Sequence, residues 1–221
     1  MSVILLHACC APCSGPAIPR LHPIGDVMVF FSNSNIYPAE EYTRRRDELA
    51  AYCIRLGVPF IEDEYAPDLW LSAVKGLENE PEKGRRCTEC FRFRLKRTAA
   101  WAQAHTLSTE KHPFYNEIPP CRTEVRPVHT EVHTEVHTEV HTEHEHTQPR
   151  PFRAFTTTLT LSPHKNSSLL LSLGHEAAAE HDIKFLDIDF KKKDGFRQSL
   201  VISREEGFYR QNYCGCQFSI R

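Results

Sequence analysis

Seven of the nine cysteines in this chain lie in three short segments. Cysteines that are so close in sequence are poor partners for structural disulfides, and they are good metal ligands or redox couples. The spacing therefore predicts metal or electron-transfer chemistry. The three segments contain Cys9, Cys10 and Cys13, then Cys87 and Cys90, and finally Cys214 and Cys216.

The first two segments supply five thiols, and a metal centre needs four. Zinc binds four thiolates in a tetrahedron, and iron-sulfur clusters are also held by thiolates, so the spacing does not choose between them. A zinc clasp that ties two loops together is the structural alternative. Cys53 falls in a predicted helix without a neighbouring thiol, which is typical of a buried, inert cysteine. We assign no role to Cys121.

The last pair flanks a single residue, in the order Cys214-Gly215-Cys216. A disulfide across one residue is cramped, and strain makes such a bond labile rather than structural. Gly215 allows the backbone to bend this tightly. We therefore expect a redox-active pair, with a further pair of metal ligands as the alternative.

Two basic segments are candidates for contact with phosphates. Residues 83–97 contain seven basic residues and one acidic residue, with Phe91 and Phe93 between them. The second segment is Lys191-Lys192-Lys193. An ordinary charged helix surface is the alternative, and the net charge of -2 gives no general attraction to polyanions. His164 and Lys165 are candidates for positioning a proton or a phosphate, or for capping the helix that follows.

Alternating strands and helices are expected to position these residues. Apolar, β-branched and aromatic runs predict strands, and caps with helical spacing predict helices, which gives an α/β fold with an open parallel sheet flanked by helices. The first cysteine segment follows the first strand, at the edge of the sheet where α/β proteins place their sites. The expected strands are 3–6, 27–31, 58–62, 155–161 and 185–190. One expected helix begins at residue 17, and the others cover 39–56, 67–74, 83–104 and 169–181.

The composition and the first residues suggest one cytoplasmic domain over residues 1–221. A chain of 221 residues with 40% hydrophobic and 25% charged residues has ordinary globular composition. Its start lacks a basic leader, and its first apolar run is too short for a signal peptide or a membrane span. We therefore expect no membrane contact and a reducing compartment, in which close cysteines are ligands or catalytic thiols.

Residues 107–152 interrupt the alternating pattern. They repeat Glu-Val-His-Thr and contain many prolines, and a connection this long is uncommon inside a compact domain. We predict a disordered, low-complexity insert. A metal-binding comb on one helical face is the alternative, but the β-branched Val and Thr oppose such a helix. Its histidines would be His129, His133, His137 and His141.

Six ordered segments resemble the QueH-type epoxyqueuosine reductases, over nearly the whole chain except 107–152. One departure is Asn33-Ser34-Asn35-Ile36, where that family has Asn-Pro-Asn-Ile. The resemblance implies a fold similar to the adenine nucleotide alpha hydrolase-like (HUP) group. The segments are 5–14, 35–42, 77–91, 156–166, 189–192 and 209–216.

The resemblance also implies a function. It implies an oxidoreductase that reduces epoxyqueuosine to queuosine at the wobble position of tRNA, the last step of queuosine biosynthesis, without cobalamin. By similarity, Cys9, Cys10, Cys87 and Cys90 would bind a 4Fe-4S cluster, and Cys214 and Cys216 would form a redox-active disulfide. A single iron ion beside the cluster is implied as well, with Cys13 and a carboxylate as candidate ligands. The electron donor is not identified.

Two other functions remain open on the residues alone. The first is a zinc-stabilised RNA-binding module without catalysis, which predicts a colourless protein that contains zinc and no sulfide. The second is a thiol-disulfide oxidoreductase that uses Cys214 and Cys216 alone. This second function predicts that Cys87 and Cys90 are dispensable for turnover.

Overall fold

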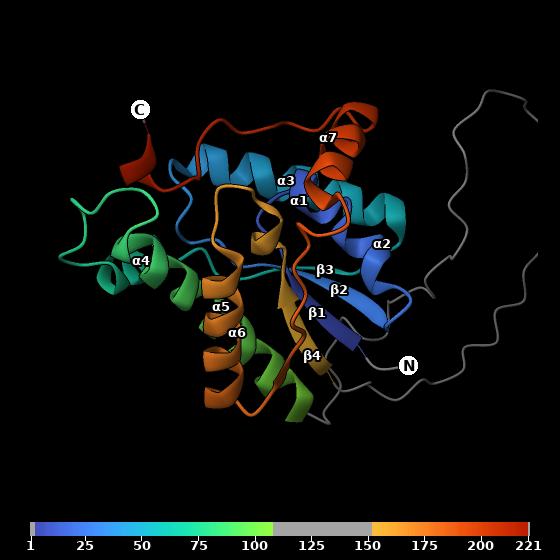
Figure 1. Cartoon of the computed structure of the whole chain (residues 1–221), viewed down its shortest axis with the longest axis horizontal. Helices are drawn as coiled ribbons and strands as arrows, with labels where there is room; N and C mark the ends of the chain where they lie inside the picture. Colours follow the sequence, from blue (N-terminus) through green and yellow to red (C-terminus); the bar gives the residue numbers. More distant parts are fainter. Residues whose placement is uncertain (1–2, 108–151, 221) are drawn as a thin grey trace, which may run out of the picture.

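Five parallel strands form one sheet at the centre of the molecule. The computed structural model describes residues 3–107 and 152–220 (Figure 1). All neighbouring strands run parallel, in the order β3-β2-β1-β4-β5, which confirms the predicted α/β fold with an open parallel sheet. The strands are β1 (Val3–His7), β2 (Asp26–Phe31), β3 (Phe60–Glu62), β4 (Phe152–Thr157) and β5 (Lys184–Phe185).

Helices connect the strands, and several of their ends follow from the sequence. Gly57 ends α3 in the left-handed conformation, with φ of 64°, which favours glycine. Asn166 caps α6 by accepting a hydrogen bond from the Leu169 amide. The helices are α1 (Ala11–Ser14), α2 (Ala17–Leu21), α3 (Ala39–Leu56), α4 (Pro67–Ala73), α5 (Arg85–Leu107), α6 (Ser167–Glu180) and α7 (Gly195–Glu205).

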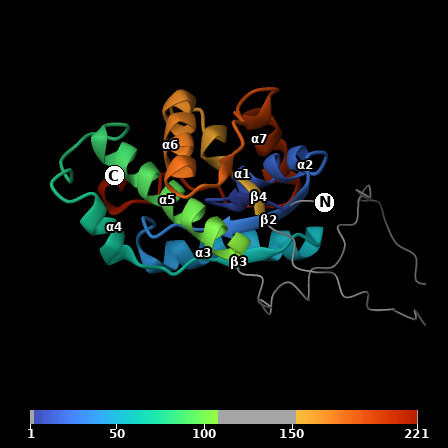
Figure 2. The ribbon, with the colours of Figure 1, turned by 90° about the horizontal axis from the view of Figure 1, so that it is seen from below.

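The sheet lies between two layers of helices (Figure 2). Successive side chains of a strand point to opposite faces, so β1 contributes to both cores. Val3 and Leu5 pack with α5 and α6, whereas Ile4 and Leu6 pack with α2 and α3. Both faces of β1 are therefore buried, which explains its continuous apolar run.

Side-chain hydroxyls shorten two of the expected strands. Thr157 accepts a hydrogen bond from the Leu159 amide, so β4 ends there and a 3-10 turn, η2 (Thr158–Leu161), follows. Thr156 and Thr160 donate to the carbonyls of Leu186 and Ile188, which takes the place of a longer strand ladder after Phe185. The predicted strands 155–161 and 185–190 were therefore right in place and wrong in extent.

Helix α7 was not expected from the sequence. Ser199 and Ser203 lie on its buried face, so the usual apolar spacing of a packed helix is absent. The predicted insert at 107–152 lies outside the described residues except at its two ends. No helix within residues 3–107 or 152–220 is long and apolar enough to cross a membrane.

Candidate thiol site

The first cysteine segment lies where the order of the strands reverses. From β1, the chain builds β2 and β3 on one side, and later β4 and β5 on the other. The loops that follow β1 and β4 therefore diverge, and α/β proteins bind ligands in the crevice at this point. The Cys9 thiol lies 3.8 Å from the Thr158 hydroxyl, across the ends of these two strands.

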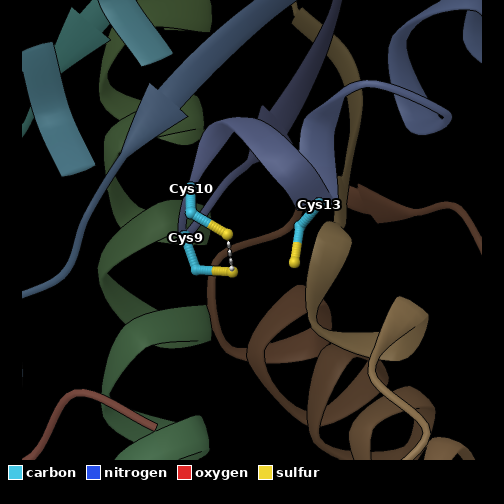
Figure 3. Close-up of side chains that lie close together, drawn as sticks. All are labelled: Cys9, Cys10 and Cys13. Atoms are coloured by element: carbon cyan, nitrogen blue, oxygen red, sulfur yellow. Dashed lines mark hydrogen bonds between the residues drawn. The ribbon is translucent and has the colours of Figure 1, made fainter. Parts of the chain in front are cut away.

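Cys9, Cys10 and Cys13, the N-terminal thiol group, lie together at this edge (Figure 3). Their sulfur atoms are all within 4.8 Å of one another, and the Cys9 and Cys10 sulfurs are 3.7 Å apart. Helix α1 begins directly after Cys10, so its first turn brings Cys13 back toward the other two. The amide of Gln211 donates to Cys10 Sγ at 3.2 Å, which joins the C-terminal segment to this group.

The N-terminal thiol group favours one thiolate. Hydrogen bonds from Cys10 and Cys13 hold the pKa of Cys9 well below its ordinary value, and the charges of Lys165 and Arg94 add to this effect. The pKa of Cys13 is raised by its hydrogen bonds to Cys10 and Cys9 and by burial. A hydrogen bond with Cys13 lowers the pKa of Cys10, but the neighbouring Cys9 and burial raise it to about 12.

The other four clustered cysteines, the cavity thiol group, surround one small cavity. Cys87 and Cys90 lie in the first turns of α5, and the Lys83 amide donates to Cys87 Sγ at 3.2 Å. Cys214 and Cys216 reach the same cavity from the C-terminal segment. The cavity therefore joins two regions of the chain that are far apart in sequence.

The same cavity is lined by polar groups that lack partners. Asn35 Oδ1, Trp70 Nε1 and Arg86 Nε are buried without hydrogen-bond geometry to any described group. The Trp70 N–H nevertheless lies close enough to Cys90 to act on the pKa of its thiol, which burial raises to about 12. Unpaired buried polar groups are costly, so these atoms are available to bind water or a ligand in the cavity.

The two thiol groups adjoin. Phe91 lines the cavity and packs in the same apolar cluster as Cys9 and Cys10, and Cys87 packs against that cluster. Burial lowers the pKa of Lys165, but the thiols of Cys214, Cys9 and Cys13 together raise it above its ordinary value. One half-buried ammonium group therefore interacts with both thiol groups.

These residues fit an iron-sulfur group. The clustered ligand atoms are all sulfur, and the unpartnered N–H groups of Trp70 and Arg86 supply the donors that sulfur acceptors need. The cavity volume of about 10 Å³ corresponds to about one water molecule. The side chains that line it must therefore move apart to admit a cluster.

The structure groups the cysteines in space differently from the predicted set of cluster ligands. It places Cys13 with Cys9 and Cys10, and it places Cys87 and Cys90 with the C-terminal pair. The 4Fe-4S ligand set of Cys9, Cys10, Cys87 and Cys90 stays a prediction. Cys214 and Cys216 are free thiols here, and the disulfide between them stays a prediction as well.

The sequence analysis missed two features of the site, which are the Nε1 of Trp70 and the Nε of Arg86 that line the cavity without a hydrogen-bond partner. Lys165, one of the predicted candidates, lies where its charge acts on both thiol groups. Arg86 lies next to Cys87 in sequence, which was the available signal. Trp70 comes from α4, and no sequence pattern connects it with the cysteines.

The expectation that residues 83–97 face phosphates stays a prediction, but the structure buries or pairs most of the charges of this segment, and Lys83 is exposed. Arg86 and Arg94 are buried, and both donate to groups within the chain. Other cations of the segment form ion pairs that neutralise them. These pairs are Arg85–Glu80, Arg92–Glu89, Arg92–Glu176, Lys96–Glu180 and Arg97–Asp63.

The fold and the site together define an α/β protein with a thiol-rich site at the switch point of its sheet. Comparison with known proteins makes this class specific. The family described as epoxyqueuosine reductase QueH matches residues 4–110 and 136–221, and this chain belongs to that family. Residues 111–135, within the predicted insert, lie outside the two matched segments.

Curated relatives with the same family name are similar in sequence to nearly the whole chain. The epoxyqueuosine reductase QueH of Acinetobacter baylyi is 34% identical, over 99% of this chain and 80% of the relative. That of Haemophilus influenzae is 31% identical, over 99% of this chain and 71% of the relative. That of Thermotoga maritima is 27% identical, over 100% of this chain and 91% of the relative.

Proposed function

We propose that this chain is a cytoplasmic epoxyqueuosine reductase, which converts epoxyqueuosine to queuosine in tRNA without cobalamin. Membership of the QueH family supports the activity, because its relatives carry that name. The observation that carries the chemistry is the presence of two thiol groups, with three thiols at the switch point of the sheet and four around the cavity. We also propose that residues 1–221 act as a single catalytic domain.

Cys9, Cys10, Cys87 and Cys90 are the proposed ligands of a 4Fe-4S cluster. When bound, the cluster supplies electrons one at a time at the centre of the site. Cys13 lies beside Cys9 and Cys10, so it is the proposed ligand for an additional iron ion. The carboxylate expected with it is not among the ligand groups that cluster in the described residues.

The reaction needs two electrons and two protons. The epoxide oxygen leaves as water, and a carbon-carbon double bond forms in its place. The Cys214 and Cys216 thiols together hold two electrons and two protons, which they release on forming a disulfide. An electron donor yet to be identified then reduces that disulfide, which restores the two electrons and two protons used in each turnover.

Lys165 is the proposed cation at the departing oxygen. Its charge lies near both thiol groups, and its pKa is raised, so it stays protonated at neutral pH. A fixed cation stabilises negative charge that develops on oxygen as the C–O bond breaks. The hydrogen bond from Lys191 Nζ to the Lys165 carbonyl, 2.8 Å, helps to hold the loop in place.

Complementation tests this function. The chain is expressed in a bacterium that lacks its own epoxyqueuosine reductase, and tRNA nucleosides are measured by mass spectrometry. We expect queuosine with the parent chain and with Cys53→Ser, and epoxyqueuosine alone with Cys214→Ser. Accumulated epoxyqueuosine with the parent chain, together with purified protein that holds zinc and no sulfide, would favour the RNA-binding module instead.

A further inference from the structure

Helix α3 carries a polar stripe that contacts the C-terminal segment and has one buried member, Arg45, and one exposed member, Arg44. Its members, the α3 stripe, are Glu41, Arg44, Arg45 and Glu48, and this spacing places them on one face of a helix. Charged residues at such spacing usually form a solvated surface. Here Arg45 is only 2% exposed, so the stripe must serve another purpose.

Arg45 binds the backbone of the C-terminal cysteine segment. Its guanidinium donates to the carbonyls of Cys214 at 3.3 Å and Tyr213 at 3.5 Å. The carboxylate of Glu41 holds Arg45 in place through a hydrogen bond of 2.7 Å to Arg45 Nε. Because a guanidinium has several donors in a fixed plane, it can bind two carbonyls and a carboxylate at once.

Neighbouring contacts extend this binding along the segment. The Tyr37 amide donates to the Gly215 carbonyl at 2.8 Å, and the Tyr213 hydroxyl donates to the Tyr37 carbonyl. The amide of Tyr209 donates to Glu48 at 2.6 Å, and its ring lies 3.5 Å from the Arg44 guanidinium carbon. Three consecutive carbonyls, those of residues 213, 214 and 215, are therefore fixed.

Gly215 packs against Arg45 in a conformation and at a distance that disfavour a residue with a Cβ. Its φ of 118° is a conformation that other residues rarely adopt, and an added Cβ would lie 3.0 Å from Arg45 Nη1. Arg45 and the Tyr37 amide bind residues 213–215 only through main-chain carbonyls, so neither contact occupies the thiols that line the cavity. The stripe thus fixes the backbone and leaves the sulfur atoms free to react.

We propose that the α3 stripe, acting through Arg45, positions the Cys214 and Cys216 pair for its redox role. Arg45 is a positioning residue, because it touches the backbone and neither sulfur. This inference rests on the proposed function in one respect, because that function gives Cys214 and Cys216 their redox role. The contacts are made with both thiols free, and a disulfide requires its own Cβ–S–S–Cβ geometry, so we infer that the contacts match the dithiol better than the disulfide. The stripe therefore stabilises the dithiol relative to the disulfide.

The test is the equilibrium of this couple in glutathione buffers, without tRNA. Trypsin releases residues 211–221, in which Cys214 and Cys216 are the only cysteines, so differential alkylation and mass spectrometry report this couple alone. The variant is Arg45→Lys, which keeps the charge but lacks the planar set of donors that binds both carbonyls and Glu41 at once. The matched control is Arg55→Lys, on the same helix, where Arg55 pairs with Glu206 at the surface.

We expect Arg45→Lys to shift the dithiol-disulfide equilibrium toward the disulfide by threefold or more, with Arg55→Lys unchanged. Glu41→Gln weakens the ion pair that holds Arg45 and leaves Gly215 and both thiols intact, so we expect a smaller shift in the same direction. Equal equilibria in the parent, Arg45→Lys and Glu41→Gln would overturn the proposal. Because no turnover is measured, a failure here is separate from loss of activity in Cys214→Ser, which tests the proposed function.

Discussion

At the scale of single residues, neighbouring charges and burial give chemically identical thiols different properties. Cys9 has a lowered pKa, whereas burial alone raises the pKa of Cys53. Cys53 lies in the core between α3 and the sheet, away from both thiol groups. The sequence spacing predicted this difference, because Cys53 has no thiol neighbour, but the pairing of Cys13 with Cys9 and Cys10 depends on the turn of α1.

Replacing Cys13 tests whether its thiol takes part in the metal site. We expect Cys13→Ser to lose the additional iron ion and keep the iron of the cluster, and we expect turnover to fall about tenfold or more, a loss typical of changes to a metal site. Cys53→Ser should retain the additional iron ion and the turnover. Iron content and tRNA nucleosides provide the readouts. If Cys13→Ser keeps the iron content and the turnover of the parent chain, this thiol takes no part in the metal site.

The buried Cys53 thiol predicts a loss of stability at alkaline pH. Its pKa is raised from 9.0 to about 12 by burial, so the folded state binds this proton more tightly than the unfolded state. Its contribution is complete below pH 9 and decreases as the pH rises toward 12, by about 1.4 kcal/mol per pH unit. Urea unfolding between pH 8 and 11 should show a shallower decrease in Cys53→Ala; identical slopes would contradict the assignment.

At the scale of elements, apolar runs were enough to place the strands, and polar contacts decided where they end. The central strand β1 and helices α3, α4 and α6 follow the expected pattern within a few residues. Strand β4 ends early because Thr157 caps a 3-10 turn, and α7 was missed because serines line its buried face. Side-chain hydroxyls that replace backbone ladders leave no periodic signal in a sequence.

The start of α7 depends on a close backbone approach. A Cβ at Gly195 would lie 1.8 Å from the Phe190 carbonyl oxygen, so a methyl group must displace the backbone. We expect Gly195→Ala to lower the free energy of unfolding by about 1–3 kcal/mol, the usual cost of overpacking. Val201→Ala, at an exposed position of the same helix, should change it by about 0.5 kcal/mol or less. Chemical denaturation compares the two, and equal stabilities would contradict this packing.

At the scale of the whole molecule, sites come from segments that the sequence keeps far apart. Cysteine spacing predicted a sulfur-rich centre, but it did not show that Cys87 and Cys90 share a cavity with Cys214 and Cys216. The basic segment 83–97 looked suited to tRNA, yet all of its cations except the exposed Lys83 are buried or paired. Acidic partners such as Glu176 in α6 and Asp63 after β3 are not part of the local sequence pattern. Long-range pairing therefore limits what a sequence pattern can predict about a surface.

The loop of residues 191–193 is the better candidate for tRNA phosphates. Lys191 contacts the Lys165 loop, and the exposed Lys192 and Lys193 have no acidic partner among the described residues. We expect Lys192→Glu with Lys193→Glu to weaken tRNA binding and to lower the slope of log K against log salt by about one per lost contact. Lys184→Glu, at the amino end of β5, is the control. An unchanged slope in the double variant would exclude this surface.

The most direct test of the central claim is turnover by the purified protein. The chain is loaded with iron and sulfide without oxygen, and it is incubated with a strong reductant and tRNA that contains epoxyqueuosine. We predict that epoxyqueuosine decreases and queuosine increases by the same amount, as measured by mass spectrometry of the nucleosides. Unchanged epoxyqueuosine with protein that has incorporated a full cluster would contradict the account.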